Sequence, residues 1–580
     1  MKKSISFTIL KRTILSNWVY LMSLLIFSIL VAIISAVNPI VFQKIIDEAI
    51  PSKNSNAVIL YVALITCLPI INTILTNFKN KIGYKFSDIC SKELRKQCFE
   101  KCLFMQLSSF DKIGSQKLMS TITRSVGRIT ELYIYGDLVN FVTNIVQFFV
   151  IIFILNSFDK KISLISCFAI PFLLIIIKLF SEKTAKNEKK YLEHLSKGEK
   201  FLLQCFYGIK TIRAFNGQKN EEDSFDNWLE TNTKLGWKIK SSHNLVRTIL
   251  PNAISQFILG ILFIVCSFLI MQSKMTVGIL VAIISYVPLL ISSINGLLSI
   301  QAGKAAISKV LKDIDEIVES PQEIILNTPI LPTLNEPVFQ FENVEFSYER
   351  GDFSLVVNDL TINKGDFLII VGGSGGGKTS IIDILNKFYD IKSGKALFYG
   401  EDFSKLSPTN IRENIATVLQ DTYIFNKSIK ENIIYPQNSA NDITEVLEKS
   451  QLTDFINSLP EKEATIIDDF GENFSGGECQ RICLARALFK NSEILLFDEP
   501  TAALDAITSK KIFDMLKNEN LNNNKTIIII THDIGKISYA TKVAVVNNGD
   551  IVEYGVPKDL LNNDGYLKQL YNSQQNNKKD

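Results

Sequence analysis

A glycine-rich loop between an apolar segment and a helix is the strongest chemical signal in the sequence. The segment Phe367–Val371 is followed by Gly372-Gly-Ser-Gly-Gly-Gly-Lys378-Thr379, which matches G-x-x-x-x-G-K-[ST] between a strand and a helix. Glycines leave backbone N–H groups free to point at phosphate oxygens, and the following helix adds its positive end. We expect Lys378 to reach the β- and γ-phosphates of a nucleotide and the Thr379 hydroxyl to bind Mg²⁺.

Two acids follow a second apolar strand. Ile494–Phe497 leads into Asp498 and Glu499, in the same α/β region as the glycine-rich loop. An acidic pair after a strand is weak evidence alone, but this context strengthens it. Asp498 fits the position that holds Mg²⁺, and Glu499 fits the base that orients and activates the attacking water.

Two further segments suggest contacts with phosphate. A β-branched strand from Thr526 ends at His532, one of three histidines in the chain, and we expect it to touch the γ-phosphate. Ser475-Gly476-Gly477-Glu478 opens a predicted helix, Cys479–Phe489, and so makes a second anion-binding helix end. Two such helix ends suggest a nucleotide held from two sides.

The elements around these residues predict an ATPase domain. From Val338 onward, strands and helices alternate, as in a parallel sheet with crossover helices. This region is predicted to span 338–571. It is preceded by a linker, 319–337, whose residues Ser320–Pro337 are rich in Pro, Asn and Thr. The tail, 572–580, is expected to be frayed.

Six long apolar stretches predict a membrane domain over residues 1–318. A bilayer core needs about 20 apolar residues per helix. Any single stretch could be a buried helix of a soluble protein, but six in order make that reading untenable. The first is too long for a signal peptide and is read as a retained span. The stretches are Trp18–Val37, Val58–Phe78, Leu138–Leu155, Ile162–Phe180, Asn252–Met271 and Val277–Ile300.

Positive charge in the loops predicts the orientation. The N-terminus carries Lys2, Lys3, Lys11 and Arg12, and the long loops after spans two and four are also basic; Lys79 is counted among the bases of the first. These regions are predicted to be cytoplasmic, and an even number of spans places the ATPase domain there too.

The two long loops themselves are predicted to be helical. Lys85–Gln106 and Lys183–Phe206 mix apolar and charged residues at helical spacing, so the spans should continue beyond the bilayer. The helix Gln301–Val318 similarly prolongs the last span. Short segments, Phe110–Gly114 and Ile209–Gly217, interrupt the loops and are suited to touch another cytoplasmic domain.

Composition excludes several other classes. The net charge of +3 gives no nucleic-acid footprint. The nine cysteines are scattered and suggest no disulfide framework. The pairs Cys98/Cys102 and Cys479/Cys483 share helix faces but have no nearby histidine, so we expect reduced thiols rather than a metal site.

The order of the motifs resembles that of ATP-binding cassette (ABC) transporters, and the membrane domain resembles that of exporter half-transporters. The resemblance covers nearly the whole chain. It implies an α-helical polytopic membrane domain of six spans fused to an α/β P-loop ATPase domain. Phe110–Gly114 and Ile209–Gly217 match in position the coupling helices that dock on the ATPase domains.

The resemblance also implies roles for individual residues. Tyr348 matches the aromatic that stacks on adenine, Gln420 the glutamine that contacts Mg²⁺, Ser475–Glu478 the signature motif, and Asp505 the loop at the dimer interface. In the family's dimer, ATP lies between each glycine-rich loop and the partner's signature motif. The implied ATP ligands are Tyr348, Gly372, Ser374, Gly375, Gly376, Gly377, Lys378, Thr379, Ser380, Ser475, Gly476, Gly477, Glu478 and Asp505, with Thr379, Gln420 and Asp498 on Mg²⁺ and Glu499, His532, Lys378 and Gln420 in catalysis.

The sequence departs from the family pattern in three places. Phe474 replaces the usual signature Leu, and Glu478 replaces the usual Gln. Asp468 and Asp469 stand where exporters more often carry Gly and Glu. Function is expected to survive the change to Glu478. Asp469 keeps the acid, but its contact with the coupling helices is expected to differ in detail.

The expected function is ATP-driven export by alternating access across the cell membrane. The chain is expected to form a homodimer in the lipid bilayer, and a heterodimer with another half-transporter stays open. An importer on the same fold and an ATP-gated channel are the rival functions. Polar residues in the spans either line a cavity or join helices, and a drug, a lipid or a hydrophobic peptide fits as the substrate.

Overall fold

The computed structural model of the 580-residue chain divides into two compact units. The first contains Met1–Leu103 and Ser115–Ser320, and the second contains Phe104–Gly114 and Pro321–Asp580. The structure describes residues 5–130, 134, 136, 139–167, 169–324, 336–349, 353–373, 375–437, 442–468, 471 and 473–576.

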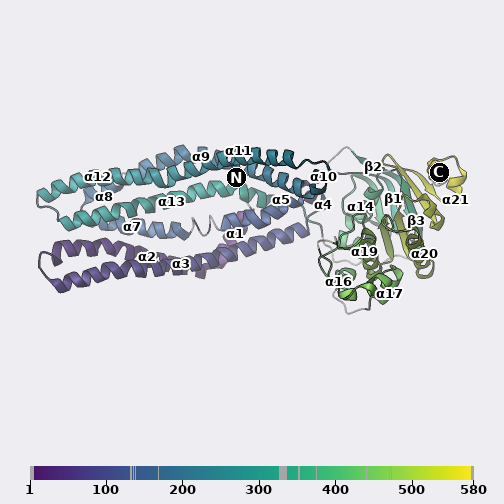
Figure 1. The fold of residues 1–580 in the computed structure, drawn as a ribbon, viewed down its shortest axis with the longest axis horizontal. Helices are drawn as coiled ribbons and strands as arrows, with labels where there is room; N and C mark the ends of the chain where they lie inside the picture. The colour runs from purple at the N-terminus through teal and green to yellow at the C-terminus, as the bar shows by residue number, and fades with distance from the viewer. Residues whose placement is uncertain are drawn as a thin grey trace. The chain divides into compact units, whose positions relative to one another are not determined.

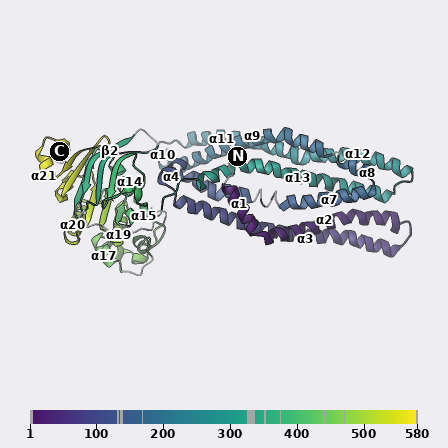
Figure 2. The same cartoon turned by 180° about the vertical axis from the view of Figure 1, so that it is seen from behind.

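The first unit consists of long helices that run beside one another (Figures 1 and 2). Several of these helices contain long apolar stretches, as expected for elements that bury their side chains against neighbouring helices or lipid. Short π-helical segments extend them, among them η1 (Ile45–Ala49), η2 (Thr121–Ser125) and η4 (Leu245–Ile249). The helices are α1 (Ile5–Ser16), α2 (Trp18–Lys44), α3 (Ser55–Leu103), α5 (Ser115–Ser120), α6 (Val126–Arg128), α7 (Asn140–Phe158), α8 (Lys160–Cys167), α9 (Ala169–Tyr207), α10 (Ile209–Ala214), α11 (Gln218–Asn244), α12 (Leu250–Met271) and α13 (Val277–Val318).

Within the described part of the chain, five helices are long and apolar enough to cross a bilayer. They begin at Trp18, Ser55, Asn140, Leu250 and Val277, and correspond to five of the six predicted stretches. The remaining stretch, Ile162–Phe180, contains Phe168, which lies outside the described residues. The count of six therefore stays a prediction.

The predicted helical extensions are present. Helix α3 continues without interruption to Leu103, α9 to Tyr207 and α13 to Val318. An ion pair of 2.6 Å joins Lys117 Nζ to Glu316 Oε2 and so links α5 to the end of α13.

The prediction that Lys79 is one of the bases of the loop after span two is wrong. Helix α3 carries Lys79 into the contact between α2, α3 and α7, where it is only 4% exposed. Its Nζ donates to Thr143 Oγ1 at 3.1 Å, and Thr143 lies 2.9 Å from Ser28 Oγ. About two helical turns nearer the start of α3, Asn72 Nδ2 donates to Ser35 Oγ of α2 at 3.2 Å. Some polar residues of the apolar stretches therefore join helices.

The second unit is built on one ten-stranded sheet, in the order β5-β4-β1-β2-β10-β9-β3-β8-β7-β6. The strands β9, β3, β8, β7 and β6 form its parallel part. The strand bounds are β1 Phe339–Ser347, β2 Ser354–Ile362, β3 Phe367–Gly372, β4 Ser393–Phe398, β5 Glu401–Asp402, β6 Ile415–Val418, β7 Ile494–Asp498, β8 Thr526–Ile530, β9 Lys542–Asn547 and β10 Asp550–Gly555.

The parallel strands are buried on both faces, which explains their continuous apolar runs. In β3, Phe367 and Ile369 contribute to one hydrophobic core, while Leu368 and Ile370 contribute to the core on the opposite face. The covering helices are α14 (Lys378–Leu385), α15 (Pro408–Glu413), α16 (Ile429–Ile433), α17 (Thr444–Lys449), α18 (Thr453–Ser458), α19 (Gly476–Lys490), α20 (Ala506–Asn523), α21 (Pro557–Asn562) and α22 (Tyr566–Asn576), with 3₁₀ turns η5 (Phe403–Lys405), η6 (Lys462–Ala464) and η8 (Ile534–Tyr539).

The expectation of a frayed tail from residue 572 is wrong for its first part. Helix α22 continues to Asn576, and Gln574 hydrogen-bonds the backbone near His532. Residues 572–576 are polar, but they continue a helix whose preceding residues Leu567, Leu570 and Tyr571 pack on the core. Residues 577–580 lie outside the described part.

The first predicted coupling segment forms helix α4, Leu107–Ile113, and belongs to the second unit. Asp111 accepts a hydrogen bond from the Tyr389 hydroxyl, and Lys112 lies 3.8 Å from a Glu349 carboxylate oxygen. The first part of the predicted linker packs beside this helix, because Gln322 forms an antiparallel bridge with Met105. Residues 325–335 of that linker are not among the described ones. The second coupling segment is α10.

Candidate functional site

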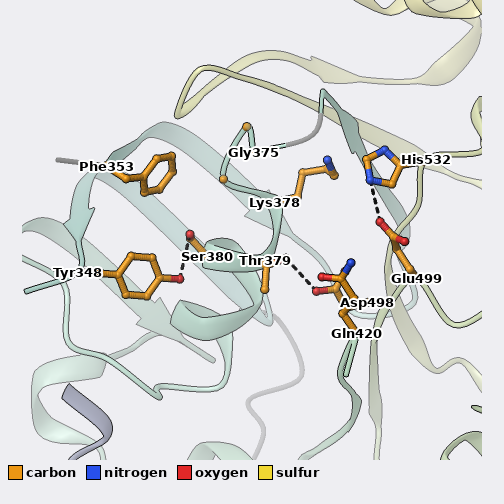
Figure 3. Close-up of a pocket in the computed structure, with 12 residues that line it drawn as sticks. Tyr348, Phe353, Gly375, Lys378, Thr379, Ser380, Gln420, Asp498, Glu499 and His532 are labelled. Atoms are coloured by element: carbon orange, nitrogen blue, oxygen red, sulfur yellow. Dashed lines mark hydrogen bonds and ion pairs between the residues drawn. The ribbon is translucent and has the colours of Figure 1, made fainter. Parts of the chain in front are cut away.

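The carboxyl ends of β3, β6, β7 and β8 meet at one edge of the sheet, because these strands are parallel. Each strand delivers predicted site residues to that edge. They surround a cavity of about 260 Å³ (Figure 3). Its lining is Tyr348, Phe353, Gly375, Gly376, Gly377, Lys378, Thr379, Ser380, Gln420, Asp498, Glu499 and His532.

The glycine-rich loop joins β3 to α14, as predicted. Gly377 caps the helix with a φ of +102°, and a Cβ there would lie 2.6 Å from the Phe353 ring. Only glycine combines that backbone with that contact. The loop therefore presents the N-terminus of α14 to the cavity, where its N–H groups can bind an anion.

Lys378 is 6% exposed and folds back onto the loop. Its Nζ donates to the carbonyl oxygens of Gly372 at 3.1 Å and Gly373 at 2.7 Å. Burial lowers the pKa of this amine, while the nearby carboxylates of Glu499 and Asp498 act to raise it. The ammonium is thus held beside the loop by contacts that a phosphate oxygen can replace.

Asp498 and Thr379 form an oxygen-rich pair. The Thr379 hydroxyl donates to Asp498 Oδ2 at 3.0 Å, and Asp498 is 1% exposed. Burial is the main cause that raises the pKa of Asp498, and the charge of Glu499 raises it further. The hydrogen bond from Thr379 and the charges of Lys378 and His532 act to lower this pKa. Keeping Asp498 ionised at neutral pH therefore lowers the stability of the folded protein.

Replacing this carboxylate should stabilise the protein. We expect Asp498→Asn to raise the unfolding temperature of nucleotide-free protein by a few degrees at neutral pH, since the amide still accepts from Thr379 without the buried charge. Because folding raises the pKa of Asp498, the stability gained by the substitution is complete at pH values above the pKa of the folded protein. It shrinks as pH falls through that value and disappears below the ordinary Asp pKa of about 3.9. Thermal unfolding in detergent at several pH values measures this; equal or lower stability at neutral pH would contradict it.

Glu499 and His532 contact each other at one side of the cavity (Figure 3). His532 Nε2 lies 2.8 Å from Glu499 Oε1. Glu499 has a φ of +51°, which costs a non-glycine residue roughly 1–3 kcal/mol. Its N–H donates to the Ile530 carbonyl at 2.9 Å, so the neighbouring strand β8 supports this conformation. Such strain is concentrated at functional sites.

Tyr348 lines the cavity with its hydroxyl turned toward α14. The hydroxyl donates to Asp383 Oδ2 at 2.6 Å and lies 3.0 Å from Ser380 Oγ. Burial raises the pKa of Tyr348, and the Asp383 bond adds to the effect. The hydrogen bonds of the hydroxyl therefore fix the orientation of the Tyr348 ring.

Two neighbours of Tyr348 were missed from sequence. Phe353 lines the cavity, and Asp383 anchors the tyrosine. The strand pairing Ser347↔Ser354 continues toward Tyr348 and Phe353, so treating 339–362 as a hairpin would have found Phe353. Asp383 carries no sequence signal beyond its place on the helix after the loop.

The predicted signature residues are not part of this cavity's lining. Ser475 caps α19: its Oγ accepts from Glu478 N at 3.3 Å, while its N–H donates to Glu478 Oε2 at 2.7 Å. Glu478, the departure from Gln, thus completes a capping box. The Phe474 ring packs edge-on against Phe455, with centroids 5.7 Å apart.

The other predicted ligands have separate positions. Asp505 caps α20 by accepting from Ile507 and Thr508 N–H groups, both at 3.0 Å, and these bonds lower its pKa. Gln420 follows β6 and lines the cavity with an exposed side chain. Gly372 ends β3 behind the loop. Ser374 and Asp469 lie outside the described residues.

Comparison with known proteins gives two family matches and many relatives. Residues 21–294 match the family model described as the ABC transporter transmembrane region, and residues 357–502 match the one described as ABC transporter. An ATP-dependent lipid A-core flippase of Haemophilus influenzae is 28% identical over 83% of this chain and 82% of its own length. A putative multidrug export ATP-binding/permease protein of Bacillus subtilis is 26% identical over 83% of each chain.

A solved structure shares the fold. The structure of a bacterial Atm1-family ABC exporter with ATP bound superposes with a TM-score of 0.84 at 23% identity, covering 97% of this chain and 98% of the other. The two matched regions follow one another on one polypeptide. The cavity is lined by residues of the glycine-rich loop, the acid pair and His532. The chain belongs to the ABC transporter family, as an ATP-hydrolysing half-transporter with the exporter fold and a multi-pass membrane domain.

Proposed function

We propose that two copies of this chain form an exporter of amphipathic or hydrophobic substrates, driven by ATP hydrolysis in the cavity described above. The observation that carries the proposal is the convergence of Lys378, Thr379, Asp498, Glu499 and His532 on one cavity. Phosphoryl transfer to water requires mainly positioning and charge stabilisation, and these groups supply both.

Each residue has a chemical task in this proposal. The N-terminus of α14 and Lys378 bind the phosphates of ATP. Glu499 orients a water molecule and accepts its proton, while His532, 2.8 Å away, holds that carboxylate and contacts the γ-phosphate.

The oxygens of Thr379, Asp498 and Gln420 fit a Mg²⁺ site. Two of them are already paired at 3.0 Å, and hydroxyl, carboxylate and amide oxygens are the ligands that this hard cation prefers. Bound Mg²⁺ would neutralise charge on the phosphates; the chain's part is to hold those oxygens in place.

The proposed catalytic unit is a dimer. Ser475, Gly476 and Gly477 form an anion-binding helix end that does not line the cavity of their own chain. A second copy can supply this helix end to the γ-phosphate. One chain carries every residue that the site needs, so a homodimer suffices; a heterodimer with another half-transporter is the alternative.

The adenine contact gives a testable prediction. We expect Tyr348→Ala to raise the KM for ATP roughly 10-fold, since loss of base–aromatic stacking is worth about 1–3 kcal/mol, while kcat changes little. Tyr348→Phe keeps the ring and loses only the bond to Asp383, so its KM should stay within about twofold. Steady-state ATPase kinetics measure both. A larger effect for Phe than for Ala would show that the Asp383 bond, rather than the ring, matters.

The proposed location is the cell membrane, with the N-terminus and the ATPase domain in the cytoplasm. The basic N-terminal residues support this orientation. Two of the relatives are described as a lipid A-core flippase and a multidrug exporter, which supports an amphipathic cargo. The described spans contain little buried charge apart from Lys79, and so favour apolar contacts with the cargo.

Transport in proteoliposomes tests the function. Purified protein is reconstituted so that the accessible ATPase domains receive external ATP, and a panel of peptides, lipids and drugs is scanned for stimulation of ATPase activity. A stimulating compound should then accumulate in the lumen, and not when the Glu499→Gln variant is used. Loss from the lumen would identify an importer, and ion conductance without coupled turnover would identify a channel.

A further inference from the structure

Two glutamine side chains hold the backbones of the two loops that carry Glu499 and His532. We propose that Gln480 and Gln574 are positioning residues for ATP hydrolysis, because each fixes one side of the Glu499–His532 contact. The inference rests on the proposed roles of that pair. Neither glutamine is among the residues that line the cavity.

Gln480 lies on α19 and is 6% exposed. Its Nε2 donates to the Glu499 carbonyl at 2.7 Å, and its Oε1 accepts from Ala503 N–H at 3.1 Å. The partners determine the orientation of the amide, since a carbonyl can only accept and an N–H can only donate. One side chain therefore spans the whole turn that follows β7.

This turn needs external support. Glu499 is in the left-handed region at φ +51°, which an unsupported chain would relax to an extended or helical conformation. Within the turn, Ala502 N–H donates to the Glu499 carbonyl at 3.2 Å, and Gln480 provides a second, shorter bond to the same oxygen. Gln480 thus fixes the peptide that determines where the Glu499 carboxylate points.

Gln574 makes the corresponding contact on the other loop. From α22, its Nε2 donates to the His532 carbonyl at 2.5 Å, and its Oε1 accepts from Ile534 N–H at 2.9 Å. The histidine side chain is largely exposed, so packing alone does not fix its position. The Gln574 side chain therefore hydrogen-bonds the residues on both sides of Asp533.

Helix α22 has its own anchor away from the cavity. Glu553 on β10 accepts from Tyr566 N–H at 2.5 Å and Leu567 N–H at 3.0 Å, at the helix start. Leu567 is fully buried. The position of Gln574 is therefore set by β10 and the core, and α22 acts as a brace for the histidine loop.

The test separates positioning from folding. Gln480→Met and Gln574→Met keep side-chain length and remove the polar atoms. We expect kcat for ATP to fall roughly 10- to 100-fold for Gln480→Met, in line with the cost of misplacing a catalytic group by about 1 Å, and several-fold for Gln574→Met. Equilibrium binding of ATP should stay within about twofold in both, because neither residue lines the cavity.

Two controls make the result decisive. Leu484→Ala opens a cavity one turn along α19 from Gln480 and should lower the unfolding temperature without the fall in kcat. In a Glu499→Gln background, Gln480→Met should cause no further loss of residual hydrolysis. An unchanged kcat for Gln480→Met, or a fall matched by Leu484→Ala at equal destabilisation, would overturn the inference. If Glu499→Gln itself leaves hydrolysis intact, the proposed function fails instead.

Discussion

Replacing Glu499 by glutamine (Glu499→Gln) should nearly abolish ATP hydrolysis while ATP binding is retained. The amide keeps the size of the side chain and can still contact His532, but it cannot accept a proton from water. A positioned general base contributes about 10²- to 10⁴-fold to a rate. Phosphate release by the reconstituted protein measures the loss, and equilibrium binding of ATP measures what remains.

A matched control uses the opposite end of the same strand. Glu493 precedes β7 and forms an exposed ion pair with Lys364 at 3.1 Å. Glu493→Gln makes the same chemical change at that end of the strand and should leave hydrolysis near wild type. Turnover of the Glu499→Gln variant within a few-fold of wild type would remove Glu499 from the role of base.

Replacing Lys378 by alanine (Lys378→Ala) should impair both binding and hydrolysis. A hydrogen bond to a charged group is worth about 1.5–3 kcal/mol, so loss of the ammonium should weaken ATP binding roughly 10- to 100-fold. The same charge is expected to stabilise the transferring phosphoryl group, so kcat should fall by a further 10²-fold or more, on the order seen when one transition-state donor is removed.

Lys395→Ala is the control for loss of a lysine in the same sheet. The exposed side chains of Lys395 on β4 and Glu342 on β1 form an ion pair at 3.6 Å. Replacing Lys395 should change neither ATP binding nor hydrolysis. Normal affinity with normal turnover in the Lys378→Ala protein would show that the two carbonyl contacts of this amine are purely structural.

Sequence reasoning predicted the parts of the site that are fixed locally. The glycine-rich loop, the acid pair and the histidine each follow a buried strand, and parallel pairing alone brings the ends of β3, β7 and β8 together. Their neighbours could not be predicted in the same way. Gln480 and Gln574 meet the two loops only through tertiary packing, and neither shows a local pattern that distinguishes it from a surface glutamine.

Two other differences from the sequence predictions concern Lys79 and helix α4. Lys79 follows an apolar stretch directly, so hydropathy alone ends the span there, whereas the continuous helix α3 carries the side chain into contact with Thr143. Helix α4 ends at Ile113, one residue before the predicted end, because Gly114, at φ +85°, ends the helix rather than belonging to it. It begins at Leu107, three residues before the predicted start.

The most direct test of the composite site uses defined mixed dimers in the Glu499→Gln background, where bound ATP persists. One chain also carries Lys378→Ala, and the other Gly476→Asp; a Cβ at Gly476 makes only an ordinary 3.7 Å contact with Ala503, so the change adds charge without a clash. Doubly tagged dimers are purified and the occluded ATP is counted. If each site joins the two chains, the mixed dimer holds one ATP and each parent dimer holds none. A mixed dimer without occluded ATP would contradict a site shared between two copies.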